Sequence, residues 1–237
     1  MELITYNGSL KTLRDYQNLN PIEQNKLIQN LKEKMQSDKE DLEISSLEDM
    51  ATYFSKQRNF FIRELGFISY DTLFINAVIV RAYQLNKGFI SLVSTGNYLC
   101  ACPLVRIQLE TVLSLWASLI ADGNYTERML LGKSVDKSKH NGNYLSNSYL
   151  IRTLCEFTNL SLKELWDKGN NYLHPSYSSI SKTIHRENNQ IILENLEGNL
   201  GKSDLEQLKN EMLEINLAYI PILKEYKDIL KRISSNM

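Results

Sequence analysis

One segment limits the fold more than any other, residues 104–120, LVRIQLETVLSLWASLI. Apolar residues fall on nearly every side of its helical wheel, which predicts a helix enclosed by other helices. Arg106 and Glu110 interrupt this pattern, and their spacing of four residues puts both side chains on one face, in line with Ser114. Because an unpaired buried charge is costly, we expect the two residues to form a structural ion pair or to line a polar cleft.

Helical spacing continues through most of the chain. Only 4 prolines and 10 glycines occur, and the segments between them follow helical spacing. In the first half of the chain, cap and stop residues predict a helix over 21–36, one from Ser45 or Ser46 to Gly66, one from Ser69 or Asp71 onward, and one from Asn97 to 121–124. In the second half they predict helices over 125–132, 149–158, 161–174 and 203–230. We expect the two long apolar helices before residue 121 to pack antiparallel, and Pro221 to kink the last helix.

The fold class that follows is all-α, a helical bundle. Residues 1–66 are interpreted as an N-terminal helical extension and residues 67–237 as the bundle, packed as one unit. Residues 133–147 are polar and predict an exposed loop. Residues 190–193, QIIL, are the best strand candidate, and we expect one small β-hairpin there.

Composition excludes some classes of function. The formal net charge of −1, from 27 basic and 28 acidic residues, gives no overall basic field, so a polyanion would have to bind locally. The three cysteines, Cys100, Cys102 and Cys155, have no zinc-site spacing, and we expect buried, reduced thiols. We predict no metal, no cofactor, no signal peptide and no membrane span, and therefore a soluble cytoplasmic protein.

A second motif occupies residues 166–176, WDKGNNYLHPS. His174 precedes a proline, so its ring is expected to project from a helix end, where a neutral imidazole could accept a proton. Lys168 could stabilise developing negative charge, and Asn171 and Ser176 are candidate substrate contacts. The structural alternatives are a histidine that fixes the turn, a solvated lysine, and turn or capping roles for Asn171 and Ser176.

LVRIQLE and NNYLHPS together resemble the HEPN (higher eukaryotes and prokaryotes nucleotide-binding) superfamily, over about residues 67–176 and the last helix. The resemblance implies a helical bundle that forms a homodimer, often as a metal-independent ribonuclease of a toxin, phage-defence or CRISPR-associated system. The family hallmark is an arginine four to six residues before a histidine at a helix end. His174 matches the histidine, whereas Lys168 holds the arginine position or that position is vacant.

Under this resemblance His174 is expected to help deprotonate a ribose 2′-hydroxyl, with Arg106 or Lys168 stabilising the transition state. Glu110 would orient Arg106 or share in proton transfer. The expected partners are RNA or a nucleotide, a second copy of the chain, and an antitoxin or defence protein. The alternative is a non-catalytic module that binds a nucleotide or a protein, or that dimerises, which accounts for the missing arginine.

Overall fold

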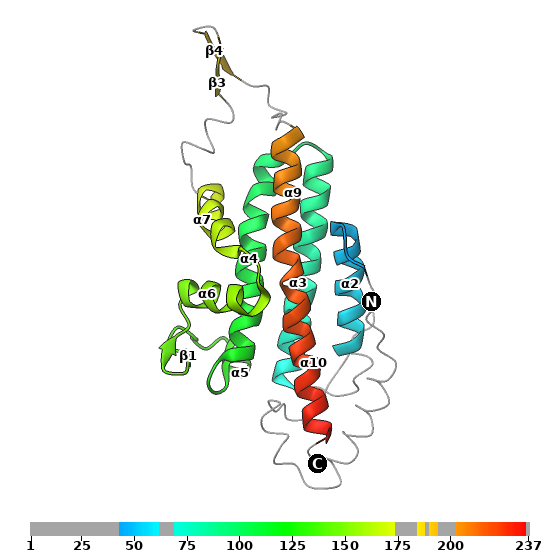
Figure 1. Cartoon of the computed structure of the whole chain (residues 1–237), viewed down its shortest axis with the longest axis vertical. Coiled ribbons are helices and arrows are strands. Elements are labelled where there is room, and N and C mark those ends of the chain that lie inside the picture. The colour runs from blue at the N-terminus through cyan, green and yellow to red at the C-terminus, as the bar shows by residue number, and fades with distance from the viewer. Residues whose placement is uncertain (1–42, 62–68, 174–183, 188–189, 194–201, 236–237) are drawn as a thin grey trace.

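A computed structural model describes residues 43–61, 69–173, 184–187, 190–193 and 202–235. It is an all-α helical bundle, as the sequence predicts (Figure 1). The helices are α2 (Leu47–Asn59), α3 (Tyr70–Ser94), α4 (Tyr98–Ile120), α5 (Tyr125–Leu130), α6 (Asn147–Thr158), α7 (Leu162–Leu173), α9 (Lys202–Leu217) and α10 (Tyr219–Ser235). The predicted helix over 21–36 and the predicted stop at Gly66 lie outside the described residues, as does the expected boundary near residue 66.

Side-chain caps start the first helices where the sequence places them. Ser46 caps α2 and Ser69 caps α3, each in a capping box, and Asn97 accepts a hydrogen bond from the backbone of Cys100 at the start of α4. In the first box, hydrogen bonds from Ser46 and Ser45 lower the pKa of the Asp49 carboxyl. These caps settle the two choices that the sequence left open.

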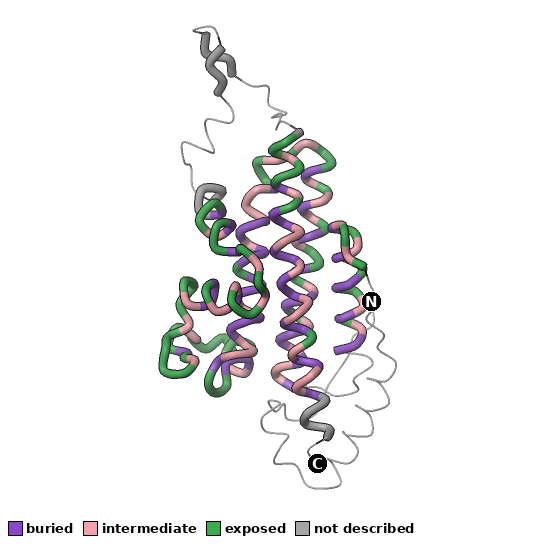
Figure 2. The backbone as a smooth tube through the Cα atoms, in the orientation of Figure 1, coloured by how far each residue is buried: buried purple, intermediate pink, exposed green. Residues whose placement is uncertain are grey.

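The long helices α3 and α4 run antiparallel and form the centre of the bundle together with α9 and α10 (Figure 1). α2 packs along one side of this centre, and α6 and α7 pack on the other side against α4. One continuous core joins them, so α2 shares its core with the helices after residue 69 (Figure 2). Its largest fully buried side chains include Phe54, Phe89, Leu109 and Tyr219.

A chain of buried amides crosses this core. Gln108 of α4 donates to the side-chain oxygen of Asn216 on α9, and Asn216 donates to Asn86 on α3 at 2.8 Å. Asn86 in turn donates to the backbone carbonyl of Leu47, the first residue of α2, at 2.7 Å. All three amide residues are fully buried, so these bonds fix how four helices register against one another.

The last helix is broken, as its proline predicts. α9 ends at Leu217 and α10 begins at Tyr219, because Pro221 has no N–H to donate to Leu217 and its ring crowds that carbonyl. The sequence predicts that this helix starts with Ser203 and that Glu206, three residues later, completes a capping box with it. α9 instead begins one position earlier, at Lys202, and Glu206 accepts from Lys209 at 2.9 Å.

Within the described ranges, two small antiparallel hairpins accompany the helices. β3 (Ile184–Glu187) pairs with β4 (Gln190–Leu193), which confirms the predicted hairpin. The second, β1 (Lys139–His140) with β2 (Asn143–Tyr144), lies in the segment expected to be a loop. Asn141 and Gly142 form its turn with φ values of 49° and 82°, and Asn-Gly is the usual signal for such a turn.

Among the described residues, α4 is the one helix that by length and apolar composition could cross a membrane. This differs from the expectation that the apolar stretches are too short, because α4 continues through polar residues that interrupt them. Within its most apolar window, 56% of the residues are buried inside the protein, as in the core helix of a bundle.

Candidate functional site

Arg106 and Glu110 form the ion pair that their spacing predicts. The Arg106 Nη2 atom lies 3.1 Å from the Glu110 Oε1 atom, and the two side chains are 5% and 50% exposed, respectively. The pair therefore joins a buried guanidinium to a carboxylate that solvent reaches. An ion pair of this kind leaves most of the desolvation cost on the arginine.

Helix α7 covers the Arg106 side chain. The Arg106 Cζ atom lies 3.0 Å from the centre of the Trp166 ring, in a cation–π stack. One turn further along α7, a Cβ atom added to Gly169 would lie 2.9 Å from the Arg106 Cδ atom. The absence of a side chain at Gly169 thus lets the backbone of α7 pass directly over the stem of Arg106.

The guanidinium keeps two donors without partners. In the part of the chain that the structure describes, the buried Arg106 Nε and Nη1 atoms have no hydrogen-bond partner, although the group carries a full charge. Burial lowers the pKa of Arg106, and the charge of Glu110 opposes that shift. Arginine nonetheless stays protonated at physiological pH. An anion or another acceptor gains more binding free energy from a buried cation with unpaired donors than from the same cation at the surface.

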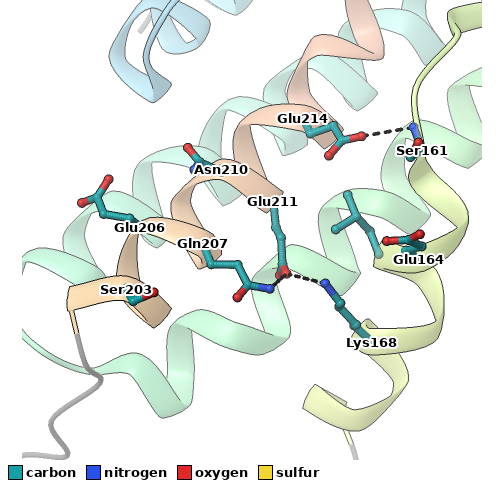
Figure 3. A pocket seen from close by; sticks show the side chains of 10 residues that line it. Ser161, Glu164, Lys168, Ser203, Glu206, Gln207, Asn210, Glu211 and Glu214 are labelled. Carbon is teal, nitrogen blue, oxygen red and sulfur yellow. Dashed lines mark hydrogen bonds and ion pairs between the residues drawn. The ribbon is translucent and has the colours of Figure 1, made fainter.

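Lys168 lies away from Arg106 and faces α9. Its Nζ atom is 3.5 Å from the Glu211 Oε1 atom, and the Gln207 side chain donates to the same oxygen at 3.0 Å (Figure 3). Glu211 is nearly buried, whereas Lys168 is 46% exposed. The lysine therefore balances a buried carboxylate rather than adding positive charge beside Arg106.

These contacts belong to a groove of about 430 Å³ between α7 and α9 (Figure 3). Its lining residues are Ser161, Glu164, Leu165, Lys168, Ser203, Glu206, Gln207, Asn210, Glu211 and Glu214. Four of them are carboxylates and one is a cation, and Lys209 beside the groove pairs with Glu206, so the groove keeps a net negative charge that disfavours phosphate. Glu214 also ties the start of α7 to α9, because it accepts from the Ser161 backbone N–H at 3.1 Å.

The remaining predicted site residues come from the end of the α7 sequence and the residues after it. His174 and Ser176 lie outside the described residues, and Asn171 belongs to α7 but its side chain is not described. The guanidinium stacks beside the middle of the helix, at Trp166. Leu173, the last residue of α7, is seven residues further on, or about 10 Å along the helix axis.

The sequence analysis missed Trp166, Gly169 and Glu211 as parts of this region. Trp166 and Gly169 are three residues apart and so share one face of α7. A large aromatic residue next to a glycine on one helical face was the available signal for a close helix contact. For Glu211 the sequence held no such signal, because its partner comes from another helix.

Two further expectations concern cysteines and metals. Cys100 is exposed, which corrects the expectation that all three thiols are buried, while Cys102 and Cys155 are partly buried. Cys100 lies in the first turn of α4 on its exposed side, whereas the next residue, Ala101, is fully buried. In the part of the chain that the structure describes, no three His, Cys, Asp or Glu side chains are grouped so that they could hold a metal ion.

Comparisons with known proteins found no match: neither protein-family models, nor curated proteins, nor solved structures gave one.

Proposed function

We propose that the chain is a metal-independent endoribonuclease of the toxin or phage-defence type, active as a cytoplasmic homodimer. In this proposal His174 is the general base and Arg106 is the cation that receives the phosphate. The observation that carries it is the buried, charged Arg106 with two open donors, on the helix whose motif resembles HEPN proteins. Structural ion pairs rarely leave such donors without partners, because each buried, unpaired donor costs about 1–3 kcal/mol.

The reaction follows from these groups. His174 removes the proton of a ribose 2′-hydroxyl, and the resulting oxygen attacks the adjacent phosphorus. The bond from phosphorus to the 5′-oxygen breaks, and this leaving oxygen takes a proton from the histidinium or from water. The products are a 2′,3′-cyclic phosphate and a free 5′-hydroxyl. Arg106 stabilises the extra negative charge on the phosphoryl oxygens during the attack, and no metal takes part.

The other candidate residues take supporting roles. Glu110 orients the guanidinium through Nη2 and so leaves Nε and Nη1 for the substrate. Lys168, which pairs with Glu211, holds α7 against α9. Asn171 and Ser176, on either side of His174 in the sequence, are the proposed substrate contacts.

A second function is favoured by one specific observation, the acidic groove between α7 and α9. Its four carboxylates against one lysine suit a basic protein segment better than a nucleic acid. Under this alternative the chain is a non-catalytic interaction module, and its expected partner is a protein with a cationic contact surface.

One assay separates the two functions. Purified wild type, His174→Ala and His140→Ala would be incubated with mixed RNA in EDTA, and the products would be resolved on a gel. His140 is a matched control because it lies on β1, paired with the Tyr149 hydroxyl and away from α7. The ribonuclease proposal expects cleavage by wild type and by His140→Ala, and none by His174→Ala. Cleavage that persists in His174→Ala contradicts the mechanism, and no cleavage by any of the three favours the interaction module.

A further inference from the structure

The two tryptophans of the chain are held in different ways. Trp116 donates its Nε1–H to Thr153 at 2.9 Å and stacks on Phe157 with ring centres 4.7 Å apart. It is 6% exposed. Trp166 is only partly buried, and its indole N–H makes no hydrogen bond to any described residue. Its ring stacks on the Arg106 guanidinium.

The stack covers the guanidinium without satisfying it. An aromatic face attracts the cation, but it accepts no hydrogen bond of ordinary strength from the Nε and Nη1 donors. A phosphate-type oxyanion would supply an acceptor in the plane of the guanidinium, to Nε or to Nη1, together with a full negative charge. A hydrogen-bonded anion therefore stabilises the Arg106 guanidinium more than the stack on Trp166 does.

A route to this position exists on the Glu110 side. Glu110 is half exposed and contacts Nη2, so solvent reaches one edge of the buried pair. The opposite side is closed, because the backbone at Gly169 lies against the Arg106 stem. The Trp166 ring contacts the guanidinium from the side and can leave it by rotating about its own side-chain bonds, without separating α7 from α4.

We propose that Trp166 is a movable cover on an oxyanion site formed by Arg106, and that a phosphate group displaces its ring to reach the guanidinium. This inference rests on the proposed function and adds a regulatory step to it. The covered form is a resting state in which Arg106 is withheld from phosphate. Binding exchanges the cation–π stack for a charge-assisted hydrogen bond from Nε or Nη1.

Fluorescence tests this directly because the chain has only two tryptophans. The Trp116→Phe protein, which keeps Trp166 as its reporter, would be titrated with inorganic phosphate, and with sodium chloride at equal ionic strength. We expect phosphate, but not chloride, to shift the Trp166 emission to the red and to increase its quenching by acrylamide. Trp166→Phe, which keeps Trp116, is the matched control and should give no response.

Two variants assign the response to Arg106. Arg106→Met keeps the length of the stem and should abolish the response. Trp166→Ala removes the cover and should bind phosphate about tenfold more tightly by calorimetry, since the lost stack no longer competes. Circular dichroism would confirm that each variant is folded.

The outcomes separate this inference from the proposed function. A Trp166 response that persists in Arg106→Met, or no response in Trp116→Phe, overturns the cover while leaving the RNA assay to judge the ribonuclease. If the Trp116→Phe variant does not fold, the emission of Trp166 is obtained by subtracting the emission of Trp166→Phe from that of the wild type. A phosphate response that depends on Arg106, in a protein that does not cleave RNA, supports the cover and contradicts the ribonuclease.

Discussion

A single glycine decides how closely α7 approaches α4. Gly169 is buried, and the nearest atoms to an added methyl group would be the Cδ and Cβ atoms of Arg106, at 2.9 and 3.3 Å. The Cβ atom belongs to the fixed end of the arginine side chain, so it cannot move aside without shifting the helix. The position of Trp166 over the guanidinium follows from this approach.

We predict that Gly169→Ala destabilises the protein, against the usual benefit of alanine in a helix. The clash should cost about 1–3 kcal/mol, which exceeds the gain of about 1 kcal/mol from helix propensity. Gly88→Ala is the matched control, because its methyl group would meet only Leu104 at 3.7 Å, and it should raise stability. Thermal unfolding measures both. A rise in Tm for Gly169→Ala would contradict the close contact.

At this scale the sequence predicts local pairs well and distant ones poorly. The spacing of Arg106 and Glu110 predicts their ion pair, because both lie on one helix. The stack on Trp166 and the pairing of Lys168 with Glu211 depend on how α7 is rotated against its neighbours. Tertiary packing sets that rotation, and the spacing of residues within one helix does not predict it.

At the scale of elements, the bundle is aligned by polar contacts as well as by apolar packing. The amide chain from Gln108 through Asn216 and Asn86 to the Leu47 carbonyl crosses α4, α9, α3 and α2 in turn. Asn216 is its central member, since it accepts from one amide and donates to the next. Its loss would strand the side-chain oxygen of Asn86 and leave the Gln108 amide with only its 3.4 Å bond to the Ala82 carbonyl, both in a buried setting.

We predict that Asn216→Ala lowers the free energy of unfolding by about 2–4 kcal/mol, the cost of a stranded Asn86 acceptor, a weakened Gln108 hydrogen bond and a small cavity. Asn210→Ala is the matched control on the same helix, because Asn210 is exposed, and it should change stability by no more than about 0.5 kcal/mol. Urea unfolding of the two variants measures the difference. Equal stability of both would show that the amide chain contributes little.

Element boundaries were predictable where one residue carries the signal. Ser46, Ser69 and Asn97 predict helix starts through their own side chains, and Pro221 predicts the break after Leu217 through its missing N–H. The β1–β2 hairpin was missed because its strands have two residues each, too few for an alternating pattern. Its Asn-Gly turn was visible but had been interpreted as part of a loop.

For the molecule as a whole, three buried tyrosines link stability to alkaline pH. Burial raises the pKa of Tyr125, Tyr219 and Tyr226, and the charge of Asp71 adds to the shift at Tyr226. A hydrogen bond with Ser118 opposes the shift at Tyr226, and one with Ser114 opposes it at Tyr125. The folded protein therefore holds these protons after the unfolded chain has released them.

We predict that stability is unaffected by these groups below about pH 10, the ordinary pKa of tyrosine, and falls as the pH rises above it. Urea unfolding at several pH values, with tyrosinate absorbance alongside, measures this loss. Tyr219→Phe should reduce the loss, because the Tyr219 hydroxyl is buried without a hydrogen-bond partner. Tyr144→Phe is the control, since Tyr144 is 57% exposed and should leave the pH dependence unchanged.

The buried amide chain also constrains how this sequence can diverge. Each of the amides at positions 86, 108 and 216 has another residue of this chain as a hydrogen-bond partner. A replacement at only one of these positions therefore leaves a buried polar atom without its partner. Replacing all three by apolar residues of similar volume avoids that penalty. Descendants of this chain should therefore keep the three amides together or lose them together, and their co-variation would mark the four helices that must stay aligned.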